Sequence, residues 1–244
     1  MMKTKALISI VSILLLYYSQ GISQERRWSF GIQVAPGISW QHYYEGADSA
    51  LARTEAEQAN GLMKSRFSYS LGFNTSYQIN PRLSLRSGVA FSRKGGRTQE
   101  STFEPTTDTS PFTAISQSWI YDHFFISVPL VAGYTFPIGN HQFRAGIGIN
   151  ADLYLRTHTI NEISSLSDGS SETIKSTNEL APYRDVILSG IVSLEYLYNL
   201  TDDFQLYVGP RLLLPWQGLL QPEIAFVNHA VYVLHLQVGL NFSF

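Results

Sequence analysis

Hydrophobic and polar residues alternate along much of this sequence. The clearest run lies between residues 66 and 79, where apolar or bulky side chains take every second position and small polar residues fill the positions between. The first set is Phe67, Tyr69, Leu71, Phe73, Thr75 and Tyr77, and the second is Ser68, Ser70, Gly72, Asn74 and Ser76. A period of two predicts a β-strand with one apolar face.

The same alternation recurs in pairs of segments that are separated by turn residues. It resumes at residues 83–91 after Asn80-Pro81-Arg82, and further pairs lie at 124–136 with 143–153 and at 186–196 with 204–212. Shorter runs at 28–34 and 232–244 open and close the set. The pattern predicts an all-β fold of about eight antiparallel strands, mostly joined as hairpins.

Two kinds of barrel share this pattern. A water-soluble, lipocalin-like barrel would turn the apolar face inward, whereas a transmembrane barrel would turn it toward lipid. The polar face is rich in Gly, Ser, Asn and Gln, while a soluble exterior usually carries many Lys and Glu. Only 15% of residues are charged and 13% are aromatic. This balance favours an enclosed polar face and a transmembrane β-barrel.

The spacing of the connections supports the membrane interpretation. Short turns are expected near residues 80, 139 and 201, and long polar loops at about 41–65, 94–121, 155–184 and 214–229. Transmembrane barrels combine short periplasmic turns with long extracellular loops and carry aromatic girdles at both interfaces. Aromatic residues near the predicted strand ends are Trp28, Tyr77, Phe91, Phe124, Tyr134, Phe136, Tyr196 and Tyr198.

The amino-terminal segment has the pattern of a secretory signal peptide. Lys3 and Lys5 precede a mostly apolar stretch at 6–18, and Gly21 and Ser23 suit cleavage before Gln24. The alternative is an uncleaved anchor, but the stretch is shorter than the roughly 20 residues of a transmembrane helix. We therefore expect a signal peptide at 1–23 and one barrel domain at 24–244.

The carboxyl-terminal segment resembles the assembly signal of bacterial outer-membrane barrels. The resemblance rests on Gln237, Gly239, Phe242 and Phe244. It implies that these residues serve recognition by the barrel assembly machinery and insertion, rather than the mature activity. The expected location is the bacterial outer membrane, with outer-membrane lipid as the surrounding partner.

Three motifs resemble those of the PorT-like outer-membrane β-barrel family of Bacteroidetes. They are Phe30-Gly31-Ile32, Phe125-Ile126-Ser127-Val128-Pro129-Leu130 and Arg144-Ala145-Gly146-Ile147-Gly148. The resemblance implies a barrel in the outer membrane. The founding member of that family is an accessory of a protein secretion system, and most members have no assigned activity.

Five polar residues are expected to face the barrel lumen. They are Arg86, Arg144, Glu195, Arg211 and His235. An eight-stranded barrel has an interior that side chains fill, and buried charges are costly unless they are paired. We therefore expect Glu195 and one or more of the arginines to form a plugging ion-pair network, with a narrow channel or a proton-sensitive plug through His235 as the alternatives.

Evidence for other chemistry is thin. The loop residues His158, Asp168, Ser170, Asp185 and His229 offer candidates for a hydrolase site at the rim, but no nucleophile motif distinguishes one hydroxyl. The chain has no cysteine, and its histidines lack a metal-binding spacing. A net charge of −2 gives no support to nucleic-acid binding.

The sequence therefore predicts a non-enzymatic barrel with no catalytic residue, cofactor or metal. An accessory or structural role in an envelope or protein secretion assembly is the leading hypothesis, with other envelope or secretion proteins as its partners. A narrow channel and a lipid or peptide hydrolase at the rim remain the alternatives.

Overall fold

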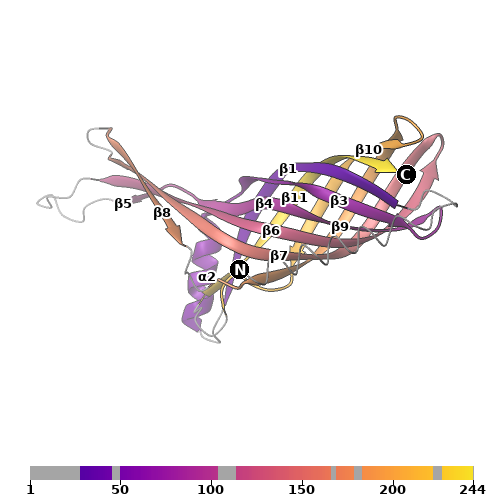
Figure 1. The fold of residues 1–244 in the computed structure, drawn as a ribbon. Coiled ribbons are helices and arrows are strands. Elements are labelled where there is room, and N and C mark those ends of the chain that lie inside the picture. Colours follow the sequence, from indigo (N-terminus) through magenta and orange to yellow (C-terminus); the bar gives the residue numbers. More distant parts are fainter. Residues whose placement is uncertain are drawn as a thin grey trace, which may run out of the picture.

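Eight strands form a closed antiparallel ring in the computed structural model (Figure 1). The structure describes residues 28–45, 50–103, 114–165, 169–178, 183–221 and 227–243. The ring strands are β1 (Trp28–Glu45), β3 (Arg66–Gln78), β4 (Leu83–Thr98), β6 (Ile115–Ile138), β7 (His141–Ser165), β9 (Val186–Asn199), β10 (Phe204–Pro215) and β11 (Val227–Ser243). The fold predicted from the alternation is confirmed.

Pairing between the first and last strands closes the ring. β1 and β11 are antiparallel from Ser29 opposite Ser243 to Glu45 opposite Val227. β1 also pairs with β3, and each later ring strand pairs with its sequence neighbours. Closure matters because a bilayer offers no water to satisfy the backbone groups of an open sheet edge.

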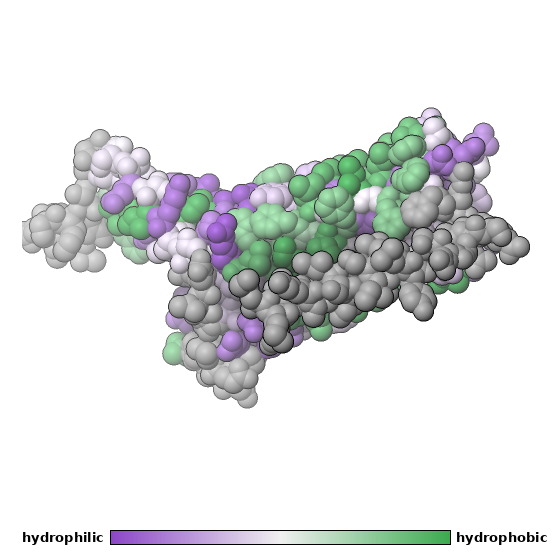
Figure 2. Space-filling model, in the orientation of Figure 1, coloured by the Kyte–Doolittle hydropathy of each residue, from purple (hydrophilic) through white to green (hydrophobic). Residues whose placement is uncertain are grey.

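The two faces of the wall have opposite polarity. Apolar side chains point outward, where Phe73 is 72% and Ile147 is 69% exposed, and they form much of the hydrophobic surface over the barrel in Figure 2. Polar side chains such as Gln33, Asn74 and Asn150 are buried inside. A water-soluble barrel has the reverse arrangement, so the lipocalin-like alternative is wrong.

The three predicted short turns are confirmed and lie at one end of the barrel. Between β3 and β4, Asn80 Oδ1 accepts hydrogen bonds of 2.8 Å from the amides of Arg82 and Leu83. Between β6 and β7, Gly139 has a φ of 60°, a conformation that glycine adopts without a steric penalty. Between β9 and β10, Thr201 Oγ1 accepts a hydrogen bond from the Phe204 amide.

The first predicted long loop contains a helix, which the sequence interpretation missed. β1 continues to Glu45, and residues 50–64 form α2 (Ala50–Leu62) and β2 (Met63–Lys64). Asn60 anchors the helix to β1 through two hydrogen bonds with the backbone of Tyr43, at 2.7 and 2.8 Å. Ala52 and Ala56 are buried, so small side chains allow the helix to pack closely.

Two further predicted loops are largely strand. The predicted loop at 94–121 includes the end of β4, the short β5 (Ser101–Phe103) and the start of β6. The predicted loop at 155–184 includes the end of β7 and β8 (Ser171–Asn178), which pairs with β7. We call β5, β8 and the adjoining parts of β6 and β7 the arm, which projects beyond the barrel body in Figure 1. The sequence gives little hydropathy contrast here, because apolar residues of the arm stand at both odd and even positions, as at Trp119 and Ile120, among Ser, Thr, Asn and charged residues.

Aromatic residues flank the apolar band of the wall. At the short-turn end, Trp28 packs on Tyr77 with ring centroids 4.8 Å apart, and Phe204 packs on Phe242 at 5.1 Å. Toward the other end, the ring of Phe91 stacks on Phe124 at 5.8 Å, although Phe124 lies within β6 and not at its end. Aromatic girdles of this kind mark the two membrane interfaces.

The predicted signal peptide and its cleavage site lie outside the described residues. Within the described part of the chain, no helix is both long and apolar enough to cross a bilayer.

A charge placed on the lipid-facing wall tests the membrane orientation. We expect Ile147→Arg, within the apolar band of β7, to lower the free energy of unfolding by about 2–4 kcal/mol in lipid vesicles. Urea unfolding of protein refolded into the vesicles measures this difference. The control is Ile174→Arg on the arm, where a change within about 0.5 kcal/mol is expected. Equal effects at both positions would contradict the assignment of the band to the bilayer.

Candidate functional site

Glu195 is the centre of the polar interior at the short-turn end. It lies on β9 directly opposite Arg144 on β7, and its side chain is fully buried. Arg144 donates to Glu195 Oε2 from Nε at 2.8 Å and from Nη2 at 2.5 Å, while Arg86 and Gln237 donate to Oε1. Four donors from three strands therefore satisfy this carboxylate, which is the condition for burying its charge.

Tyr207 packs against this cluster. The Arg86 guanidinium lies 5.1 Å and the Arg144 guanidinium 5.7 Å from the centre of its ring, within the range of cation–π contact. The Tyr207 hydroxyl donates to Gln33 Oε1 at 3.2 Å and accepts from Asn74 Nδ2 at 3.0 Å. The ring is completely buried and held at both its face and its hydroxyl.

A second buried ion pair lies farther from the short turns. Lys94 Nζ is 2.5 Å from Asp152 Oδ2, and both side chains are only 4% exposed. Ser127 donates to the other oxygen of Asp152 at 2.5 Å. The sequence interpretation missed this pair because it placed Lys94 at the start of a loop. The sequence did contain a signal for this pair. Lys94 is separated from Arg86 by an even number of positions, and so is Asp152 from Arg144, so each shares the inward strand face of a predicted lumen residue.

The interior is not polar throughout. Eight buried apolar residues also form a cluster, in which Tyr154 and Tyr183 pack from the side. The cluster contains Phe125, Val131, Ile187, Ile191, Leu213, Leu219, Val231 and Val233. Ile187 and Ile191 of β9 face inward among polar residues, so apolar and polar positions alternate less regularly in this strand.

Histidines and an amide link the strands beyond this apolar cluster. His123 interacts through Nε2 with Gln41 Nε2 and through Nδ1 with Thr157 Oγ1, each at 2.7 Å. The ring of His229 lies 5.8 Å from the ring of His123. These contacts bring β1, β6, β7 and β11 together across the interior, which leaves little room for a solute.

All five predicted lumen residues lie inside the barrel, but they do not form a single network. Arg86, Arg144 and Glu195 meet in one cluster. Arg211 lies directly opposite His235, whose Nε2 is 3.2 Å from Ser68 Oγ, and the described residues contain no ion pair to Arg211. A plugging role for the five remains a prediction.

Two residues of the predicted assembly signal also stabilise the mature barrel. Gln237 donates to Glu195, and a Cβ atom at Gly239 would lie 2.3 Å from the ring of Tyr207. These contacts concern the packing of the mature barrel, and the expectation that the residues serve insertion rather than the mature activity stays a prediction. Phe242 packs on Phe204 at the membrane interface, Phe244 lies outside the described residues, and recognition by the assembly machinery stays a prediction.

The candidates for rim catalysis do not converge. His158 packs edge-on against Phe124 on the outer surface, whereas His229 lies in the interior beside His123. Ser170 lies just before β8, Asp185 is exposed just before β9, and Asp168 is outside the described residues. Within the described ranges, no three His, Cys, Asp or Glu side chains are grouped so that they could hold a metal ion.

Two cavities lie along the described part of the barrel. One of about 260 Å³ opens at the short-turn end and is lined by residues that include Trp28, Gln142 and Arg144. The other is about 10 Å³, room for roughly one water molecule, and lies among Arg86, Arg211 and Gln237. The Glu195 cluster and the apolar cluster therefore interrupt any wide path through the described interior.

A closed eight-stranded wall with an apolar exterior and a filled polar interior defines a small transmembrane β-barrel protein. Residues 18–218 match the family model described as an outer membrane protein beta-barrel domain, so the chain belongs to that family and lies in the bacterial outer membrane. The predicted fold class and location are confirmed, while the narrower resemblance to the PorT-like family stays a prediction. No curated protein matches the sequence.

Solved barrels resemble the chain over most of its length, although with low identity. Ail, the attachment invasion locus protein of Yersinia pestis, has 17% identity and a TM-score of 0.32, with 88% of this chain and 99% of Ail covered. Neisserial surface protein A has 17% identity and a TM-score of 0.37, with 88% and 97% covered. OprG from Pseudomonas aeruginosa has 12% identity and a TM-score of 0.41, with 92% and 99% covered.

Removal of the central carboxylate tests the energetic role of the cluster. We expect Glu195→Gln to cost about 3–5 kcal/mol, because Arg86 and Arg144 would remain buried without a counter-charge. The matched control is Glu162→Gln, whose partner Arg97 is 2.9 Å away at a pair about two-fifths exposed, and here the cost should stay within about 1 kcal/mol. Urea unfolding in vesicles gives both values, and equal losses would contradict a special role for Glu195.

Gly239 offers a separate test of packing against insertion. We expect Gly239→Ala to destabilise the barrel by about 1–3 kcal/mol, because the added methyl group meets the fixed ring of Tyr207. Refolding into vesicles without assembly machinery isolates this packing effect from recognition in the cell. Gly61→Ala is the control, since nothing lies within 4 Å of its added Cβ. If Gly239→Ala leaves the stability unchanged, packing against Tyr207 is not the reason that this position needs glycine.

Proposed function

We propose that this outer-membrane barrel is a non-enzymatic accessory or structural component of an envelope or protein secretion assembly, and that it binds a protein partner through its arm. The observation that carries the proposal is an exposed apolar face on the arm. The resemblance of three motifs to the PorT-like family supports the same direction, because its founding member is a secretion accessory.

The apolar face is defined by strand register. Phe103 lies opposite Ile115, and Trp119 lies in line with Asn161 and Ile174 on the two neighbouring strands. Directly opposed residues share one face of a sheet. We call Phe103, Ile115, Trp119, Ile163 and Ile174 the arm face.

The arm face remains exposed. Phe103 is 56%, Ile174 47% and Trp119 37% exposed, and Ile115 and Ile163 are half-buried. These residues share the inward orientation of the barrel lumen, but the arm has left the barrel and no opposite wall covers them in the described structure (Figure 1). Contiguous apolar surface of this kind commonly marks a protein-binding site.

The edge of the arm suits an extended segment of another protein. Among the described residues, β8 pairs with β7 alone, so its other edge presents free backbone donors and acceptors. Residues 171–177 are all exposed and contain neither Pro nor Gly. A partner strand could add to this edge through main-chain hydrogen bonds and place apolar side chains over the arm face.

The interior argues against a channel as the main role. A permeating solute would have to pass the Glu195 cluster, where each carboxylate oxygen is already bonded, and the buried apolar cluster around Ile191. Opening such a path would leave buried charges unpaired, at a cost of several kcal/mol. The contacts of the protein with its surroundings therefore lie on the outer surfaces of the barrel.

Site-specific crosslinking in native membranes tests the proposal. A photoreactive residue at Ile174 or Trp119 should crosslink to an envelope or secretion protein, identified by mass spectrometry. Thr173 is the matched control, because it lies on the same strand but on the opposite face. Crosslinks to lipid only, or equal protein yields at Thr173 and Ile174, would contradict a partner on the arm face.

A further inference from the structure

The described barrel interior carries more positive than negative charge. Its buried cations are Arg86, Lys94, Arg144 and Arg211, and its buried carboxylates are Asp152 and Glu195. Asp122 is also buried, but it is paired with Arg66 and does not belong to this set. Asp152 pairs with Lys94, and Glu195 is shared by Arg86 and Arg144. Arg211 is only 6% exposed, yet no ion pair joins it to a carboxylate of the described residues.

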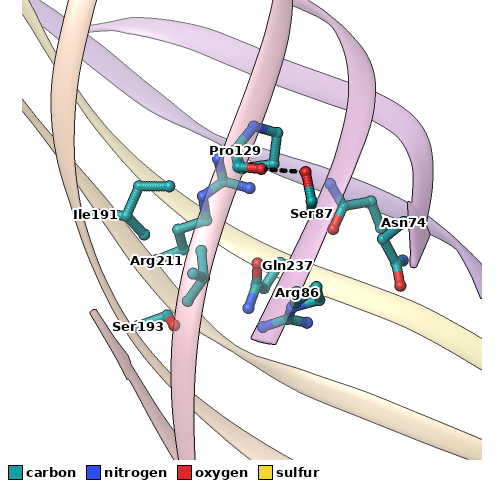
Figure 3. Close-up of a pocket in the computed structure, with 10 residues that line it drawn as sticks. Asn74, Arg86, Ser87, Pro129, Ile191, Ser193, Arg211 and Gln237 are labelled. Carbon is teal, nitrogen blue, oxygen red and sulfur yellow. Dashed lines mark hydrogen bonds between the residues drawn. The ribbon is translucent and has the colours of Figure 1, made fainter. Parts of the chain in front are cut away.

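Unpaired donors gather at the small cavity beside Arg211. Arg211 Nε, Arg86 Nη1 and Ser193 Oγ are buried and have no hydrogen-bond partner, and all three residues line the cavity. Figure 3 shows Arg86, Arg211, Ser193 and Gln237 around this space. Asn74 Oδ1 is an unpartnered acceptor among the described lining residues, and the Ser193 hydroxyl can either donate or accept.

Burial of these groups without a ligand would be costly. Each unsatisfied buried donor destabilises the folded state, and an uncompensated buried charge destabilises it more. A water molecule would satisfy donors but would neutralise no charge. An anion in the cavity would accept from the donors that line it, and it would also balance the Arg211 guanidinium, which makes no ion pair with a carboxylate of the described residues.

We propose that the cavity between Arg86, Arg211 and Ser193 binds a single monatomic anion, of which chloride is the abundant example. The cavity of about 10 Å³ holds roughly one water-sized sphere and leaves no room for phosphate or a carboxylate ligand. A chloride ion is somewhat larger than a water molecule, so the long Arg86 and Arg211 side chains must shift slightly to admit it. The bound anion is a structural counter-charge of the lumen, and this role is independent of any partner on the arm.

Bromide provides a direct readout because it replaces chloride and scatters anomalously. Crystals of the purified barrel grown in bromide should show an anomalous peak within hydrogen-bonding distance of Arg211 Nε. In detergent, the unfolding midpoint should also rise by about 3–5 °C for each tenfold increase in halide above the dissociation constant, relative to gluconate at equal ionic strength. Neither measurement on the wild-type protein depends on a variant that must fold.

Two substitutions test whether the anion binds at Arg211. Arg211→Met should abolish both the anomalous peak and the halide-dependent shift, whereas Arg97→Met, at the partly exposed pair with Glu162, should leave both unchanged. Density for water alone, with no halide-specific shift, would overturn the proposal. A bromide peak that persists in Arg211→Met would overturn it as well.

Discussion

The need to pair every backbone group within the bilayer constrains the rest of this structure. Antiparallel pairing of β1 with β11 removes the last open edge of the sheet, so the wall needs no water at membrane depth. A closed ring of eight strands is narrow, and its alternate side chains must therefore fill the inside. The same alternation that gives lipid an apolar surface thus fixes a polar interior, and every charge in that interior needs a partner from another strand.

The Glu195 cluster shows how this requirement links the wall together. Its donors come from β4, β7 and β11, while the carboxylate comes from β9, so the contact joins strands from different parts of the sequence. Lys94 and Asp152 repeat the arrangement farther along the barrel. Such pairs stabilise less than an apolar core of equal volume would, but only the correct strand register brings all their members together. The charged residues of the interior therefore favour the observed strand register over shifted registers.

The sequence predicted the features that depend on local pattern. Period-two alternation located the ring strands, turn residues located the three short turns, and strand parity placed Arg86, Arg144 and Glu195 inside. Features that depend on long-range contacts were missed. The helix α2 rests on Asn60 bonding to the backbone of Tyr43. In the arm, apolar residues stand at both odd and even positions, as at Trp119 and Ile120, so the two faces show little hydropathy contrast. The close approach of Tyr207 to Gly239 could not be predicted from the sequence, because only the folded structure brings the two residues together.

The barrel and the arm differ because only the barrel lies within the bilayer. Inside the bilayer, the positions that face lipid must be apolar, because a polar group facing lipid is costly, and a charge that faces the lumen is costly unless it is paired. Beyond the bilayer, β6 and β7 continue without that restriction, and the face that pointed into the lumen becomes open to solvent. Apolar residues there, such as Trp119 and Ile174, contribute nothing to filling the barrel. Their exposure is accounted for if the arm meets another protein, while the filled barrel holds the arm at the membrane surface.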